Sequence, residues 1–163
     1  MISVVTNCTA KKLGRPAPAR ELYLGPSVAR VVKAVDEARA WGAPVALYII
    51  SAKYGLLGEY DVVEPYDETL SGRPREELKR WAAERGVLER LKKLAEASTL
   101  VLVLSKPYYT AVEEAACETG AYVIAPFKPN CGVWIRSGNF DKHIALRKLL
   151  KELSTPNPSS STR

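Results

Sequence analysis

The chain has 163 residues, of which 47% are hydrophobic and 26% charged, and this composition excludes a chain that is disordered throughout. Its length fits one domain with its own core, and its apolar runs, such as residues 100–104, are too short for a membrane span of ~20 residues. A formal net charge of +6 favours an anionic partner, and by itself it does not distinguish nucleic acid, a nucleotide and acidic lipid.

Four short apolar segments that do not alternate with polar residues are typical of strands covered on both faces. They are residues 2–6, 45–51, 100–105 and 122–125. Helical spacing predicts helices at residues 26–41, 74–96, 107–119 and 140–153, with a break at Gly86 and an N-cap at Asn139. We therefore predict a three-layer α/β domain over residues 1–153, with a mostly parallel sheet of about four or five strands and helices on both faces.

The two ends of the chain also carry signals. Residues 1–6 lack a basic stretch followed by a long apolar run, so they are interpreted as a first strand rather than a signal peptide. Residues 154–163 are rich in Ser and Pro and are predicted to be a disordered tail.

Cys8, Cys117 and Cys131 lie far apart, and no pair has the close spacing of a metal site. We therefore predict no metal and no cofactor. An odd cysteine count without a signal peptide favours a reducing compartment, so we expect a cytoplasmic protein. The absence of Gln, with abundant Arg, Glu and Pro, resembles thermophile proteins, in which one intracellular disulfide would be tolerated.

Lysine, hydroxyl and amide side chains follow each predicted strand. They are Asn7, Lys11 and Lys12 after the first, Ser51 and Lys53 after the second, Ser105 and Lys106 after the third, and Lys128 and Asn130 after the fourth. Because parallel strands end at one edge of a sheet, we expect an anion-binding cleft there. The alternative is that these lysines only solvate loops.

Cys8 lies just past the first strand, where a nucleophile could sit, and neighbouring lysines are the surroundings that activate a thiol. The alternative is an inert, buried cysteine, because His143 is the only histidine and lies on a distant helix.

The loop after the second strand, residues 52–73, is longer than most loops in compact domains. It gathers five carboxylates beside Lys53, which favours a local acid/base site, and three tyrosines suited to stacking on a base. These are Glu59, Asp61, Glu64, Asp67 and Glu68, and Tyr54, Tyr60 and Tyr66. The alternative is a loop packed by its own Tyr, Leu and Pro residues.

The stretch SAKYGLL at residues 51–57, followed by Asp61 and by EPYDETL at residues 64–70, resembles the signature of YaaA-like proteins and of a related family of small uncharacterised domains. Residues 7–12 and 21–24 are similar to motifs at the start of that related family. The YaaA family is linked to the oxidative-stress response and to DNA binding, and some relatives act in nucleobase modification. The chain is much shorter than YaaA itself.

The resemblance implies an α/β domain with these motifs around one cleft. The residues it places there are Asn7, Cys8, Lys11, Lys12, Tyr23, Ser51, Lys53, Tyr54, Gly55, Asp61, Pro65, Tyr66 and Thr69. The strand ends add Lys106 and Lys128 to the predicted ligand-binding residues.

These observations predict a protein that binds nucleic acid or a nucleotide. The alternative is an enzyme acting on a nucleobase or nucleotide, in which Lys53 orients the substrate, Asp61 is the general base and Cys8 a nucleophile. A scaffold without a concave site is the third reading.

Overall fold

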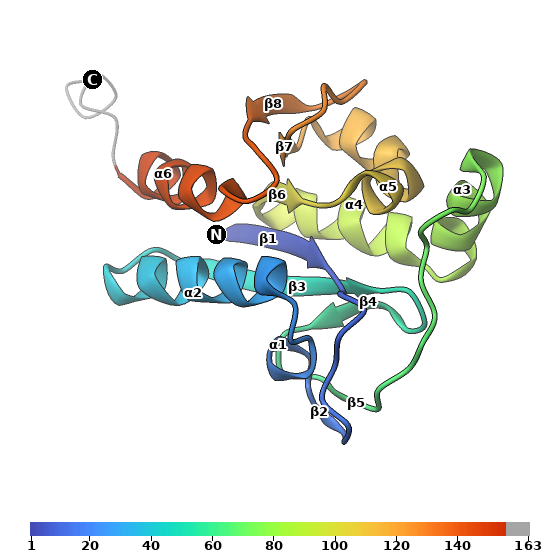
Figure 1. Cartoon of the computed structure of the whole chain (residues 1–163). Helices are drawn as coiled ribbons and strands as arrows, with labels where there is room; N and C mark the ends of the chain where they lie inside the picture. Colours follow the sequence, from blue (N-terminus) through green and yellow to red (C-terminus); the bar gives the residue numbers. More distant parts are fainter. Residues whose placement is uncertain (156–163) are drawn as a thin grey trace.

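The computed structural model describes residues 1–155, and a six-stranded sheet runs through its centre (Figure 1). Its strands, in spatial order, are β4 (Gly55–Gly58), β3 (Val45–Ser51), β1 (Ile2–Asn7), β6 (Thr99–Val103), β7 (Tyr122–Ala125) and β8 (Val133–Arg136). All neighbours are parallel except β3 and β4. The predicted α/β class with a mostly parallel sheet is therefore confirmed.

The sheet has six strands, so the prediction of four or five is too low. The four predicted strands are the inner ones, whereas β4 and β8 form the two edges. Within β8, Val133, Trp134 and Arg136 are exposed, so this short strand lacks the run of buried residues that is typical of the inner strands. A further two-stranded ribbon, β2 (Ala17–Pro18) with β5 (Val62–Val63), lies outside the main sheet.

Helices cover both faces of the sheet. On one face, α2 (Pro26–Ala40) and α6 (Lys142–Ser154) enclose a core that includes Val4 and Val101. On the other face, α3 (Arg75–Glu84), α4 (Val87–Ala97) and α5 (Lys106–Thr119) enclose a second core that includes Val5 and Leu102. Neighbouring β1 residues thus face opposite cores, which is why residues 2–6 of the strand are all buried. A short helix, α1 (Ala19–Leu22), precedes α2.

Helix boundaries mostly agree with the sequence pattern. Gly86 separates α3 from α4, as predicted, and its φ of 70° is a left-handed conformation that glycine adopts without strain. The predicted cap at Asn139 is wrong, because α6 begins at Lys142 after Asp141. Because α6 ends at Ser154, that residue is not part of a tail, and the rest of the predicted tail, from 156 on, lies outside the described residues. No helix within residues 1–155 is both long and apolar enough to cross a membrane.

The order of the strands locates a crevice. From β1 the chain passes through α2 to β3 on one side, and it later returns to β6 on the other side of β1. The connections after β1 and β6 therefore diverge at the carboxyl end of the sheet. Ligands of open α/β sheets bind at such a switch point.

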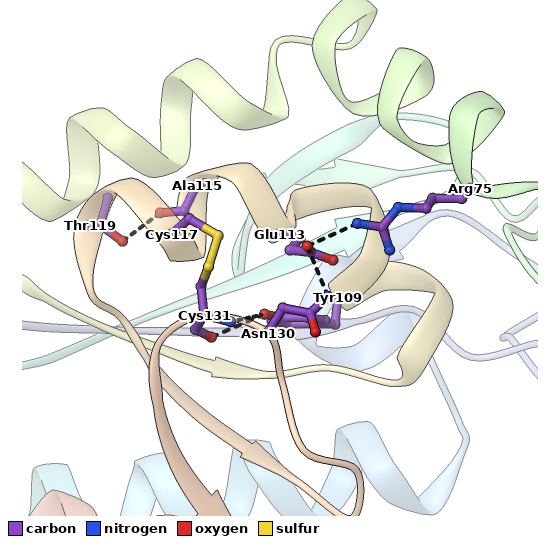
Figure 2. The surroundings of a disulfide bond; sticks show 8 residues. All are labelled: Arg75, Tyr109, Glu113, Ala115, Cys117, Thr119, Asn130 and Cys131. Atoms are coloured by element: carbon purple, nitrogen blue, oxygen red, sulfur yellow. Dashed lines mark hydrogen bonds and ion pairs between the residues drawn. A yellow bond between two sulfur atoms is a disulfide. The ribbon is translucent and has the colours of Figure 1, made fainter.

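A disulfide between Cys117 and Cys131 joins the last turn of α5 to the segment that leads into β8 (Figure 2). Cys8 is the one free cysteine of the described residues. Beside the disulfide, the Tyr109 hydroxyl donates a hydrogen bond to the Cys131 carbonyl at 3.0 Å, and Glu113 accepts one from Asn130 at 3.2 Å. The disulfide and these bonds tie the connection between β7 and β8 to α5.

Candidate functional site

The ends of β1 and β6 are joined across the switch point. The Asn7 side-chain Oδ1 accepts a hydrogen bond from the backbone N–H of Ser105 at 2.8 Å, and Asn7 Nδ2 donates to the Cys8 carbonyl at 3.1 Å. Asn7, Thr9, Ala10 and Ser105 line two different cavities. This junction is therefore a wall common to both.

The first cavity, of about 350 Å³, is bounded by the segment after β1, the start of α2 and the start of α6. Four of its lining side chains carry basic nitrogen, Lys11, Arg30, Lys142 and His143, and none of its lining residues is acidic. We call it the basic cavity. Helix N-termini also favour negative charge, and those of α2 and α6 both contribute lining residues.

Gly25 allows this cavity to form. A Cβ at Gly25 would lie 2.5 Å from Thr9 Cγ2, which is closer than packed atoms approach. With no side chain there, the Gly25 N–H donates a hydrogen bond to Thr9 Oγ1 at 3.2 Å. The segment after β1 is thereby held against the N-terminus of α2.

The surroundings of the basic cavity disfavour the protonated forms of two of its lining side chains, Lys142 and His143. Burial lowers the pKa of the Lys142 ammonium. The pKa of His143 is lowered by burial first, and then by the positive charges of Arg147 and Arg30. A bound anion would compensate this concentration of positive charge and raise both pKa values.

The second cavity, of about 300 Å³, lies on the other side of the junction and is lined by residues of both charge signs, Lys12, Asp67 and Glu68 among them. We call it the mixed cavity. Cys8 and Tyr108 also line it, and Cys8 Sγ lies 3.1 Å from Tyr108 Oη. The Cys8 thiol is thus buried but in contact with a proton-bearing group.

Tyr23, Ser51 and Tyr66 form a buried cluster of hydroxyl groups. The Ser51 hydroxyl donates to Tyr66 Oη at 2.7 Å, and the Tyr23 and Tyr66 hydroxyls are 2.7 Å apart. Burial raises the pKa of Tyr23 to about 12 and raises the pKa values of Tyr66 and Tyr108 as well. These hydroxyls therefore stay protonated near neutral pH. Residues 21–24, 51–57 and 64–70 each contribute one residue to this cluster, so these three sequence segments pack together.

The structure divides the predicted site residues into groups. Asn7 and Lys11 line the basic cavity, and Asn7, Cys8, Lys12 and Thr69 line the mixed cavity. Tyr23, Ser51 and Tyr66 are buried in the hydroxyl cluster, Tyr54 packs edge-on against Tyr66 with ring centroids 5.5 Å apart, and Gly55 begins β4 with a φ of 80°.

The remaining predicted residues line neither cavity. The ammonium group of Lys53 lies 5.4 Å from the Tyr54 ring centroid, that of Lys106 lies 6.0 Å from the Phe127 ring centroid, and Lys128 is exposed. Asp61 accepts a hydrogen bond from the Gly58 N–H at 2.8 Å and closes a turn. The strands do end at one edge, as predicted, but their lysines do not gather in one cleft.

The five carboxylates of the loop after β3 do not form one acid/base site. Glu59 is buried and paired with Arg20 and Arg39, whereas Asp67 and Glu68 line the mixed cavity. Within residues 1–155, no group of three or more His, Cys, Asp or Glu residues is arranged to hold a metal ion.

Sequence reasoning missed four residues of the basic cavity: Arg30, Phe140, Lys142 and His143. Arg30 lies in the second turn of α2, and its i, i+4 spacing from Pro26 at the helix start was the one signal available. The positions of the other three residues depend on where the chain leaves β8, and β8 was not predicted.

Residues 3–131 of the chain match a family of unknown function (DUF6884). The comparison with curated proteins gives no match. The matched range contains all lining residues of the mixed cavity, whereas the wall of the basic cavity from Asn139 to His143 lies beyond it.

Proposed function

The chain belongs to the DUF6884 family, and we propose that it binds a nucleotide, or the phosphate-bearing end of a nucleic acid, in the basic cavity at the carboxyl ends of β1 and β6. The observation that carries the proposal is the charge of this cavity. Basic nitrogen lines it from three separate segments, and no carboxylate among its lining residues offsets that charge.

The arrangement suits a phosphate group. Arg30 offers a planar guanidinium for two parallel hydrogen bonds to phosphate oxygens, and Lys11 adds a mobile positive charge. Pro26, the first residue of α2, has no N–H, but the N–H groups of Ser27 and Val28 that follow have no partner within the helix and point toward its N-terminus, where Gly25 and Ser27 line the cavity.

Two further observations favour a nucleotide over a small inorganic anion. A volume of about 350 Å³ exceeds the space that a single phosphate fills and lies within the ~300–1,000 Å³ of small-molecule sites. The net charge of +6 and the resemblance to YaaA-like proteins favour the same class of ligand.

The proposal is tested by calorimetric titration of inorganic phosphate, nucleoside monophosphates and a short oligonucleotide at several salt concentrations. We expect affinity to fall as salt rises, and Arg30→Ala to weaken binding by about tenfold or more. Arg15→Ala is the matched control, because Arg15 is exposed and does not line the cavity. Absence of binding by all of these ligands at low salt would overturn the proposal.

A second candidate function is supported by the position of Cys8. Its thiol contacts the Tyr108 hydroxyl in the mixed cavity, which shares a wall with the proposed phosphate site. An enzyme acting on a nucleobase or nucleotide would use Cys8 as nucleophile and the protonated Tyr108 hydroxyl as proton donor. Lys53 and Asp61 line neither cavity, so neither has a place in this mechanism.

Mass spectrometry distinguishes the two candidates. The protein and its Cys8→Ser and Tyr108→Phe variants are incubated with nucleosides and nucleoside monophosphates. A covalent adduct on Cys8, or a released base that depends on Cys8, supports the enzyme. If neither an adduct nor a released base is found, the enzyme is excluded for these compounds and the binding proposal is unaffected.

A further inference from the structure

We propose that the ring of Phe140 is a platform on which an unpaired base of the bound nucleotide stacks. The ligand is then a mononucleotide or a single-stranded end, and not a duplex. This inference rests on the proposed phosphate binding in the basic cavity and adds to it the chemistry of the rest of the ligand.

Phe140 is 82% exposed, the largest exposure among the large hydrophobic residues of the described chain. Single exposed apolar side chains are common on protein surfaces and need no function. Phe140 differs because it lines the basic cavity, together with Arg30 and Lys142. An aromatic ring that is open to solvent beside cationic groups matches the two halves of a nucleotide, its base and its phosphate.

The backbone that carries the ring is held in place. Arg30 Nη1 donates a hydrogen bond to the Phe140 carbonyl at 3.3 Å. On either side, the Ser137 N–H donates to the Ala125 carbonyl at 3.1 Å, and the Ile144 N–H donates to the Asp141 carbonyl at 3.0 Å. Arg30 therefore both lines the proposed phosphate site and fixes the segment that presents the ring.

The chemistry of phenylalanine defines the class of ligand. Its ring offers a face for stacking and no hydrogen-bonding group, so it tolerates any base. Stacking needs a free base face, which a base within a duplex lacks because its neighbours cover both faces. The cavity volume of about 350 Å³ also fits a nucleotide and not a double helix.

The competing explanation is that Phe140 anchors a partner protein. Ile144, 58% exposed in the first turn of α6, would extend such an apolar surface, but it does not line the basic cavity. A protein anchor would need both side chains, whereas base stacking needs Phe140 alone.

The experiment compares ligands with and without a base. Ribose phosphate, adenosine monophosphate, a phosphorylated single-stranded oligonucleotide and the same sequence as a duplex are titrated into the full chain. The same titrations are made with Phe140→Ala, Phe140→Trp and two controls, Ile144→Ala and Tyr60→Ala. Tyr60 is 68% exposed and lines neither cavity.

We expect Phe140→Ala to weaken binding of adenosine monophosphate and of the single strand by about 5- to 150-fold, the range measured when a stacking aromatic is removed. Ribose phosphate should bind this variant and the unaltered chain equally, and Phe140→Trp should retain nucleotide binding. The two controls should bind every ligand as the unaltered chain does.

Three results would overturn the inference while leaving the proposed function intact. The first is equal affinity for adenosine monophosphate and ribose phosphate, the second is an equal loss of both in Phe140→Ala, and the third is a duplex that binds as well as the single strand. Failure of every phosphate-bearing ligand to bind would instead overturn the proposed function itself.

Discussion

The side chain of Asn7 accepts a hydrogen bond from the backbone N–H of Ser105 at 2.8 Å, although 98 positions separate the two residues in the chain. Asn7 ends β1, and Ser105 precedes the first residue of α5. This bond joins the carboxyl ends of β1 and β6, from which the chain continues in different directions. It also forms the wall between the basic cavity and the mixed cavity.

Replacing Asn7 separates its structural role from its role at the cavity. Asn7→Ala should lower the free energy of unfolding by about 1–3 kcal/mol, because it leaves the part-buried Ser105 N–H without its acceptor. Asn7→Asp keeps an acceptor and should recover part of that stability, but its negative charge in the basic cavity should weaken phosphate binding. Urea denaturation and phosphate titration measure the two effects.

Asn130→Ala serves as the control for Asn7. Asn130 is exposed and donates to Glu113, away from both cavities, so its loss should cost less than about 1 kcal/mol and leave phosphate affinity unchanged. If Asn7→Ala unfolds at the same urea concentration as the unaltered chain, the bond to Ser105 does not join the strands in solution.

The inner strands could be predicted because each is buried on both faces, which favours apolar runs such as residues 100–104. The edge strands could not. Gly55 and Gly58 bound β4 and read as turn residues, whereas β8 is stabilised by pairing with β7 and not by an apolar side-chain pattern.

The residues of the candidate site also fall into those that could be predicted from the sequence and those that could not. Asn7 ends β1, and Cys8 and Lys11 lie in the segment that follows it, so the rule that ligands bind beyond parallel strand ends was enough to select them. Arg30 and Lys142 lie in helices whose positions relative to the end of β1 depend on the order of strands in the sheet. Strand order has no local sequence signal. The Cys117–Cys131 pairing, at a separation of 14, likewise depends on where α5 and the β7–β8 connection lie in space.

Reduction of the disulfide should destabilise the protein. Chain-entropy arguments assign about 3 kcal/mol to a closed loop of this size, since the cross-link restricts the unfolded chain. We expect the Cys117→Ser/Cys131→Ser double variant to unfold at a lower urea concentration than the unaltered chain, by an amount that reductant reproduces. The tyrosine contacts in Figure 2 should persist in the folded variant, because they need no sulfur.

Thiol titration after unfolding provides the check on this pairing. Without reductant, the unaltered chain should show one reactive thiol, from Cys8, and with reductant three. Three thiols without reductant would show that the cross-link does not form. A Cys8→Ser variant should be equally sensitive to reductant, since Cys8 has no part in the bond.

The hydroxyl cluster predicts a loss of stability at alkaline pH. Burial raises the pKa of Tyr23 to about 12 in the folded protein, against an ordinary value of 10.0. Between these values the unfolded chain loses the proton and the folded chain keeps it. The stability contributed is therefore complete below about pH 10 and is lost as pH rises toward about 12, at about 1.4 kcal/mol per pH unit for one tyrosine.

Urea denaturation across this pH range measures the effect, with tyrosinate absorbance as a second signal. Tyr23→Phe should reduce the slope of stability against pH, because it removes one of the buried titrating groups. Tyr60→Phe is the control, since the exposed Tyr60 lies outside the cluster and should leave the slope unchanged. Tyrosinate absorbance that rises well before unfolding, to the full number of tyrosines, would show that the cluster is open to solvent.

Glu59 connects the segment after β4 to helices α1 and α2. It is 5% exposed, and its carboxylate pairs with Arg20 at 2.7 Å and with Arg39. Glu59→Gln keeps the size of the side chain but removes the buried one of the two carboxylates, Glu59 and Asp36, that both guanidinium groups contact. Because both arginines keep some contact with solvent, we expect a loss of about 2 kcal/mol, below the ~3–5 kcal/mol of a fully buried pair.

Glu64→Gln gives the matched comparison, because Glu64 is an exposed carboxylate of the same loop and should cost less than about 0.5 kcal/mol. The two variants carry the same change in net charge, so a general charge effect would shift both unfolding curves equally. Equal shifts in urea denaturation would therefore contradict a specific role for Glu59. A loss confined to Glu59→Gln that persists at high salt would show that its pairing is shielded from solvent ions, as burial requires.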